Sequence, residues 1–251
     1  MNKKIKVVGL IPTRLNSSRL PQKALLMIHK IPLVVHTYKR AKMSKKLDDL
    51  YICCDDMKIF KTVKKYKVKA IMTSKHHKNG TERINEAYKK LNVRYDLVVD
   101  IQGDEPLISP FHIDQVVKYH TKNIQSDIVL PNLKIKVKNN TNIVKVVKDI
   151  KNNVLYLSRG NVPFEFKNRV DWFNKHLSIV SFKPEALEKF SLNKKTPLEK
   201  AEDIELLRAL EIGLKIKTLN LKGDSFSVDV PEDFEKASEV MTKDKFFKLY
   251  K

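Results

Sequence analysis

The sequence predicts an α/β fold in which a mostly parallel sheet carries helices on both faces. Short apolar runs rich in β-branched residues alternate with amphipathic segments through the first half of the chain. This alternation is typical of successive βαβ units with right-handed crossovers, which give parallel strands. The length of 251 residues suits one such domain with a substantial core.

The first half of the chain supplies four strands and four helices in alternation. The run LVVDI at 97–101 reads as a buried central strand, because it is almost entirely apolar. The expected strands are 6–11, 50–54, 68–73 and 97–101, and the expected helices are 33–42, 57–66, 81–91 and 113–120.

The middle of the chain has strand-like runs with few helices between them. They lie at 127–136, 143–149, 154–158 and 176–182. Strands without crossover helices usually pair antiparallel, so we expect an antiparallel extension at one edge of the sheet. The extension covers about 127–182 within a single domain that spans 1–251.

The last part of the chain predicts two helices and two short strands. Pro197 opens a helical segment over 198–212, and Gly213 suits its C-terminal end. Strands are expected at 215–221 and 226–228, and a terminal helix starts at Pro231.

One side of the 198–212 helix carries charged residues at three-residue spacing. They are Glu202, Glu205 and Arg208. Such spacing usually means a salt-bridged, exposed face.

Charge and composition restrict the classes of partner. The formal net charge is +21, but only eight of the 50 cationic residues are Arg, and the lysines are spread along the chain. Nucleic-acid readers usually place Arg forks or rows of aromatic side chains beside the charge, and no such row is visible. A lysine-rich bias therefore accounts for the charge, and no nucleic acid is expected; salt-sensitive RNA or DNA binding is the alternative.

The cysteines and the apolar runs indicate a cytoplasmic, soluble protein. Cys53 and Cys54 are adjacent, which suits neither a metal knuckle nor a disulfide framework, so we expect buried thiols in a reducing compartment. No segment approaches the roughly 18 apolar residues that spanning a bilayer requires, so no membrane insertion is expected.

A basic loop follows the first expected strand. In the segment IPTRLNSSRLPQK at 11–23, an apolar run ends in a loop with Arg14, Arg19 and Lys23. Such a loop lies at the carboxyl end of the strand, where α/β sheets bind ligands. Three cations there predict a cradle for phosphate or carboxylate, and hence an anionic substrate.

Two aspartates are candidates for a metal site. Asp104, in the segment QGDEP, follows strand 97–101 directly, and Asp229 follows the expected strand 226–228. Each alone could equally be a turn or helix-cap residue. Two carboxylates that converge on one cleft would suit Mg²⁺, which completes its coordination with phosphate and water.

The segment NGTER precedes the helix expected at 81–91. Thr81 is a plausible N-cap, and Arg83 lies in the first turn, where a cation is unfavourable unless an anion lies nearby. That anion is either a ligand or Glu82. His176 is either a ligand contact or a surface residue, and His77 is expected to be solvated.

Taken together, these segments resemble the CMP-sugar-acid synthetases, and most closely the 3-deoxy-manno-octulosonate (KDO) cytidylyltransferases. The similar segments occur in order over nearly the whole chain. They are IPTRLNSSRLPQKALL, VVHTYKRA, CDD, MTSKHHKNGTER, VVDIQGDEPLI, NIVKVVKD, LYLSRGNVPFE, KHLSIVSF, LEKAEDIELLRALE and VDVPEDFEKA.

The resemblance implies a Rossmann-like nucleotidyltransferase fold, related to the nucleotide-diphospho-sugar transferases, in a homodimer. It implies Mg²⁺-dependent condensation of CTP with an acidic sugar, for lipopolysaccharide or surface-glycan synthesis. The residues implied for the nucleotide are Pro12, Thr13, Arg14, Lys23, Ser74, Thr81 and Arg83, and those for the sugar are Arg19, Gln102, His176 and Glu205. Asp104 and Asp229 would hold Mg²⁺ and, with Arg14 and Lys23, would be catalytic.

The departures from the family pattern fall mostly near the sugar residues. Gln22 and Ala24 replace a glycine and a proline, Val180 replaces a tyrosine, and Leu206 replaces a glutamine. Loss of a hydroxyl and an amide removes hydrogen-bond partners for a sugar, so unmodified KDO is the leading acceptor, with 8-amino-KDO or a nonulosonic acid as the alternative. A nucleotide-sugar glycosyltransferase is the rival enzyme, but Asp100 lies four residues from Asp104 and forms no Asp-x-Asp pair.

Overall fold

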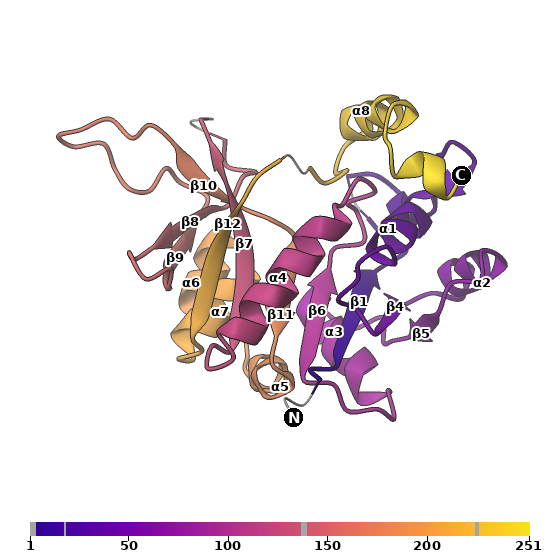
Figure 1. Cartoon of the computed structure of the whole chain (residues 1–251), viewed down its shortest axis with the longest axis horizontal. Helices are drawn as coiled ribbons and strands as arrows, with labels where there is room; N and C mark the ends of the chain where they lie inside the picture. Colours follow the sequence, from indigo (N-terminus) through magenta and orange to yellow (C-terminus); the bar gives the residue numbers. More distant parts are fainter. Residues whose placement is uncertain (1–3, 18, 137–139, 224–225) are drawn as a thin grey trace.

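The computed structural model describes residues 4–17, 19–136, 140–223 and 226–251 (Figure 1). Its main sheet has the strand order β5-β4-β1-β6-β11-β7-β10-β8-β9, and β12 pairs with the second edge of β7. Parallel pairs build the half of this sheet from β5 to β6, and the other half is mostly antiparallel, although β12 pairs in parallel with β7.

The parallel half is built by the first four long apolar runs. Its strands are β1 (Val7–Thr13), β4 (Asp49–Cys54), β5 (Ala70–Met72) and β6 (Leu97–Ile101). β1 pairs in parallel with β4 and β6, and β4 pairs in parallel with β5. The α/β prediction is confirmed, and the carboxyl ends of β1 and β6 lie next to each other.

Helices cover both faces of this sheet. Alternate residues of β1 point to opposite faces, so Val7 and Ile11 enter one buried cluster, whereas Val8 and Leu10 enter the other. The helices on the first face are α1 (Leu33–Ala41), α2 (Met57–Lys65), α4 (Pro110–Lys122) and α8 (Pro231–Thr242). Those on the second face are α3 (Gly80–Lys89), α5 (Pro184–Leu192) and α7 (Glu205–Glu211).

The antiparallel strands join the sheet beside β6. They are β7 (Ile128–Ile135), β8 (Lys145–Lys148), β9 (Val154–Ser158), β10 (Phe173–His176) and β11 (Ile179–Phe182). The strand predicted at 176–182 is β10 and β11, interrupted at 177–178. Because β11 pairs with β6 whereas β10 pairs with β8, the break lets the two neighbours diverge.

The last part of the chain departs from the prediction in three places. The helix expected over 198–212 is α6 (Pro197–Glu202) and α7, because Asp203 adopts a left-handed conformation with φ of 50°. Helix α5 was not predicted. The strand expected at 226–228 does not form, since this segment runs beside the loop after β6 and the Val228 N–H donates to the Asp104 carbonyl at 2.9 Å.

The remaining elements are short or lie near the C-terminus. They are the 3-10 turns η1 (Lys23–Leu25) and η2 (Phe247–Leu249) and the strands β2 (Met27–Ile28), β3 (Ile31–Pro32) and β12 (Ile216–Leu221). Figure 1 shows α8 and the C-terminal segment beside α1. In the described part of the chain, no helix combines the length and the apolar character needed to cross a bilayer.

Candidate active site

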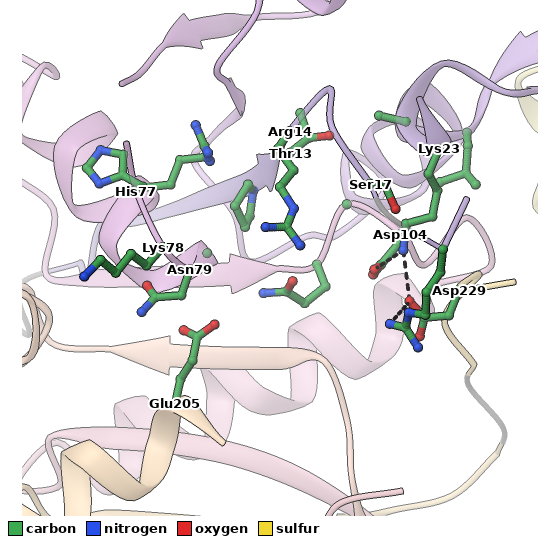
Figure 2. Close-up of a pocket in the computed structure, with 18 of the residues that line it drawn as sticks. Thr13, Arg14, Ser17, Lys23, His77, Lys78, Asn79, Asp104, Glu205 and Asp229 are labelled. Atoms are coloured by element: carbon green, nitrogen blue, oxygen red, sulfur yellow. Dashed lines mark hydrogen bonds and ion pairs between the residues drawn. The ribbon is translucent and has the colours of Figure 1, made fainter. Parts of the chain in front are cut away.

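A polar pocket of about 340 Å³ opens at the carboxyl ends of β1 and β6 (Figure 2). The basic loop, the start of α3, the loop after β6 and the start of α7 surround it. Its lining includes many of the predicted residues, namely Pro12, Thr13, Arg14, Arg19, Lys23, Arg83, Gln102, Asp104, Glu205 and Asp229. The fold therefore brings these residues together from distant parts of the chain.

The two predicted metal ligands meet at one ammonium group. The Lys23 Nζ lies 2.8 Å from the Asp104 Oδ2 and 3.0 Å from the Asp229 Oδ1 (Figure 2). Arg19 adds a 2.9 Å contact to the same oxygen of Asp229. Burial raises the pKa of the Asp229 carboxyl, but Lys23, Ser227 and Arg19 outweigh burial and hold it below its ordinary value. Both carboxylates therefore contact one shared ammonium group.

Close backbone approach brings Asp104 to the end of β1. A Cβ at Gly103 would lie 2.8 Å from the Pro12 carbonyl oxygen, so any other residue would push the loop away from β1. The Val228 hydrogen bond to the Asp104 carbonyl then draws in the C-terminal segment. Asp229 is thereby fixed beside Asp104, although 125 residues separate them in the chain.

The basic loop is anchored at its base, where Arg14 stays exposed. The Leu15 N–H donates to the Asp55 Oδ1 at 3.0 Å, which ties the loop to the end of β4. Arg14 is exposed, lines the pocket and forms no ion pair with a described residue. Its guanidinium is therefore available for an anionic ligand.

Arg83 has a protein partner for its charge. The side chain is buried, with its Nη2 3.3 Å from the Asp55 Oδ2 and its Nη1 donating to Thr73 and to the Ser74 carbonyl. The acidic partner of Arg83 is therefore Asp55 and not Glu82, and Arg83 also lines the pocket, where a ligand contact stays a prediction. Asp55 lies in the CDD segment but had been given no role.

The start of α3 is capped by a different residue from the one predicted. The Asn79 side chain accepts a hydrogen bond from the Glu82 N–H at 2.8 Å, so Asn79 is the N-cap. Thr81 is buried and donates its hydroxyl to the Glu205 Oε2 at 2.6 Å. Ser74 and Thr81 do not line the pocket; Thr81 positions Glu205, which does.

Glu205 lies at the positive end of α3 and shapes the other side of the pocket. Burial raises the pKa of its carboxyl, although the Thr81 hydroxyl and the backbone N–H groups of Thr81 and Gly80 oppose the shift. Figure 2 shows Glu205 opposite Asn79 and Lys78. A carboxyl group here can hydrogen-bond to a hydroxyl-rich ligand.

His176 is the predicted sugar residue that lies outside the pocket lining. Its Nε2 is buried and has no hydrogen-bond partner among the described residues. Burial, with a smaller contribution from Lys175, lowers the pKa of its imidazole to about 4. His176 is therefore neutral near pH 7.

Several pocket residues were missed by the sequence reasoning. His77 was expected to be solvated, yet it lines the pocket and pairs with Glu86. Lys78, Asn79, Lys195 and Asp203 line it too. The segment MTSKHHKNGTER contains the first three of them, whereas nothing in the sequence linked Lys195, before α6, or Asp203, between α6 and α7, to this pocket.

The predicted exposed face of the 198–212 helix is wrong. The Arg208 guanidinium is buried, and its Nε and Nη2 donate to the two Glu199 oxygens at 2.6 and 2.7 Å. The Glu202 carboxylate accepts from the Ser158 hydroxyl. These charges are structural because Glu199 and Arg208 lie on the buried sides of α6 and α7, with Glu82 of α3 beside them.

The donor set of the pocket suits Mg²⁺. Asp104 and Asp229 already share one cation, and Mg²⁺ commonly takes one or two protein carboxylates together with phosphate and water. The described residues contain no group of three or more His, Cys, Asp or Glu side chains that could hold a metal by themselves. A site built from protein and nucleotide together fits these residues, whereas an all-protein metal site does not.

Comparison with known proteins identifies the family. A family model described as cytidylyltransferase matches residues 8–216. The chain belongs to this family. The cytidylyltransferase is similar along its length to the 3-deoxy-manno-octulosonate cytidylyltransferase of Thermodesulfovibrio yellowstonii, at 39% identity over 93% of this chain and 97% of the relative. It is also similar to the 8-amino-3,8-dideoxy-manno-octulosonate cytidylyltransferase of Shewanella baltica, at 36% identity over 95% and 99%.

Solved structures agree with this assignment. CMP:2-keto-3-deoxy-manno-octonic acid synthetase, complexed with CTP, superimposes with a TM-score of 0.89 at 29% identity, covering 95% of this cytidylyltransferase and 99% of that chain. A cytidylyltransferase of Leptospira borgpetersenii, at 19% identity and a TM-score of 0.68, shares the fold. The predicted nucleotidyltransferase fold and enzyme class are confirmed, and the enzyme is of the CMP-KDO synthetase type.

Proposed function

We propose that this cytidylyltransferase condenses CTP with a 3-deoxy-2-ulosonic acid, KDO or a close analogue, and releases pyrophosphate. The observation that carries the proposal is the meeting of Asp104 and Asp229 at Lys23, beside the exposed guanidinium of Arg14. Cations on one side suit a triphosphate, and carboxylates beside them suit the metal that accompanies it. The relatives named for KDO and 8-amino-KDO support the choice of acceptor.

In the proposed reaction an acceptor hydroxyl attacks the α-phosphorus of CTP, and the bond to pyrophosphate breaks. The enzyme must hold these two anions together and stabilise the charge that develops on the phosphate oxygens. Arg14 and Lys23 supply positive charge on the triphosphate side. Glu205 and Gln102 line the opposite side, where they would accept or donate hydrogen bonds to sugar hydroxyls.

We assign Mg²⁺ to Asp104 and Asp229. The ion would polarise the phosphate oxygens and make a nearby hydroxyl easier to deprotonate. The Lys23 ammonium contacts both carboxylates and keeps them together without repulsion. A cation that binds both of them must compete with this ammonium.

The departures from the family pattern bear little on the pocket. Val180 and Leu206 are buried in the apolar cluster that contains α5 and α7, and neither lines the pocket. Gln22 accepts a hydrogen bond from Lys58 outside it, and Ala24 is the one substituted residue in the lining. These positions support unmodified KDO as the acceptor, with 8-amino-KDO as the second candidate.

A matrix of donors and acceptors tests the proposal. Purified protein is incubated with CTP, UTP, ATP or GTP and with KDO, 8-amino-KDO or a nonulosonic acid, with Mg²⁺ or EDTA, and pyrophosphate is measured. We expect release with CTP, an octulosonic acid and Mg²⁺. Turnover without added metal in EDTA would reject the metal assignment, and no release from any acceptor would reject the activity.

We also propose a homodimer built on the antiparallel half of the sheet. Phe164 and Phe166 in the 159–172 loop are each 82% exposed, which is unusual for phenylalanine on a free surface. Light scattering should give twice the mass of the chain, and Phe164→Ser with Phe166→Ser should give the monomer mass. A wild-type monomer at micromolar concentration would reject the dimer.

The cellular setting is a further part of the proposal. We place the enzyme in the cytoplasm, as the reduced, buried Cys53 and Cys54 suggest, and its product in lipopolysaccharide or surface-glycan synthesis. Depletion of the protein should deplete the CMP-activated sugar and then the glycan that carries it. Fractionation of cells should recover the chain with cytoplasmic markers.

A further inference from the structure

Asp100 is a buried carboxyl group directly behind the pocket. It lies on β6, between Leu10 of β1 and Val180 of β11, and only 3% of it is exposed. It does not line the pocket. An acid at the centre of an apolar sheet is costly, so it needs an explanation beyond packing.

The two carboxyl oxygens of Asp100 differ in their hydrogen bonding. The Gln102 Nε2 donates to the Asp100 Oδ2 at 2.9 Å. The Asp100 Oδ1 is buried and has no hydrogen-bond partner among the described residues. A residue that served only to fill the sheet would not leave a buried oxygen unpaired.

The surroundings of this carboxyl group disfavour its charged form. Burial, together with the nearby Glu205 and Asp104 carboxyls, raises the pKa of Asp100 well above its ordinary value, against the smaller opposing effect of Gln102. In the structure this carboxyl group engages Gln102 through Oδ2, which accepts the hydrogen bond from the amide nitrogen.

The hydrogen bond to Asp100 holds the Gln102 side chain at its amide nitrogen. Its Nε2 is bound to Asp100 and lies close to α3, since a Cβ at Gly80 would come within 3.3 Å of it. Gln102 also lines the pocket, and its Oε1 has no partner among the described residues. The amide nitrogen is engaged by the protein and the amide oxygen is left for a ligand.

We propose that Asp100 is a positioning residue that fixes the orientation of the Gln102 amide, so that Gln102 Oε1 accepts a hydrogen bond from a hydroxyl group of the acceptor sugar acid. The inference rests on the proposed function and deepens it, because it assigns a hydrogen-bond-accepting oxygen to the side of the pocket that binds the sugar acid. Without Asp100 the amide turns freely and presents its nitrogen as often as its oxygen. A sugar hydroxyl then loses an oriented acceptor, whereas CTP loses nothing.

The test separates positioning from stability. Asp100→Leu removes the acceptor of the Gln102 bond at similar size, and Asp100→Asn keeps a carbonyl oxygen in its place. We expect Asp100→Leu to raise the KM for the sugar acid about tenfold and to change the KM for CTP less than twofold. Asp100→Asn should restore the sugar KM to within about threefold of wild type. Asp49→Asn, on β4 away from the pocket, is the matched control.

A double variant tests whether Asp100 acts through Gln102. In a Gln102→Leu background, adding Asp100→Leu should change the sugar KM no further. If the two substitutions raise the sugar KM independently, so that their effects multiply in the double variant, the inference is overturned. It is also overturned if Asp100→Leu alone leaves the sugar KM unchanged or raises the CTP KM equally. If Asp100→Leu does not fold, Asp100→Ala takes its place. A wild-type protein without turnover rejects the proposed function itself, whereas active wild type with an unaffected variant rejects this inference alone.

Discussion

Replacing Asp229 by asparagine keeps the size of the side chain and removes one of the two carboxylates that meet at Lys23. The variant loses an ion pair to Lys23 at 3.0 Å and one to Arg19 at 2.9 Å. Arg19 is largely exposed, so that pair contributes under about 1 kcal/mol to stability, and the more buried Lys23 pair contributes about 1–2 kcal/mol. For a chain of this size the midpoint of thermal unfolding should fall by about 4–10 °C.

The loss of activity should be larger than the loss of stability. Removing one preorganised electrostatic group from an active site commonly lowers kcat by about 10²–10³, which corresponds to about 2.7–4 kcal/mol. The Mg²⁺ concentration that gives half of the maximal rate should rise at least about tenfold, because one proposed ligand has lost its charge.

Pyrophosphate release at 25 °C, where the variant remains folded, measures both quantities. Asp48→Asn is the control, because Asp48 forms an ion pair with Lys4 on the surface and also accepts a hydrogen bond from the Val7 N–H far from the pocket. It should lose a little stability and no activity. Asp229→Asn with kcat within threefold of wild type and an unchanged Mg²⁺ requirement would refute the two-carboxylate site.

Three further predictions concern stability and backbone fit. Glu199→Gln leaves the buried Arg208 guanidinium without its main counter-charge and should lower the free energy of unfolding by about 3–5 kcal/mol in urea; a change below 1 kcal/mol would contradict it. Burial lowers the pKa of His120 from 6.5 to about 4, so its contribution to stability is full above pH 6.5 and is lost as the pH falls to about 4. His120→Gln should therefore flatten the pH dependence of unfolding in that window by up to about 3 kcal/mol, and an unchanged slope would exclude His120 as its source. Gly103→Ala should reduce kcat at least about tenfold, because its Cβ would collide with the Pro12 carbonyl and displace Asp104; crystals with an unmoved loop would argue otherwise.

The sequence was most informative where periodicity and position within the chain decide the outcome. The parallel half of the sheet follows from alternating apolar and amphipathic runs, and the basic loop and Asp104 follow from their places at strand ends. Asp229 was placed at the pocket although the strand expected before it does not form. Its position depends on the Val228 bond to the Asp104 backbone, and a residue pattern does not reveal such a bond.

Tertiary packing decided the features that the sequence did not predict. Arg208 has the spacing of a surface residue, yet α6 and α7 fold back so that it meets Glu199 and Glu82 in the interior. Asp203 ends α6 in a left-handed conformation, and a pattern search that looks for glycine at helix ends does not find it. His77 reaches the pocket because its side chain pairs with Glu86 of α3, nine residues later in the chain. Each depends on contacts between segments whose mutual placement is set by the whole fold.

The hydrogen bond between Val228 and the loop after β6 has a consequence for synthesis on the ribosome. A nascent chain that has emerged only as far as β12 contains the strands of the main sheet and the basic loop, yet it carries Asp104 without Asp229. The pocket is therefore completed late, when the C-terminal segment that carries α8 docks. Unfinished or C-terminally truncated chains that lack Asp229 should be inactive even if they bind nucleotide.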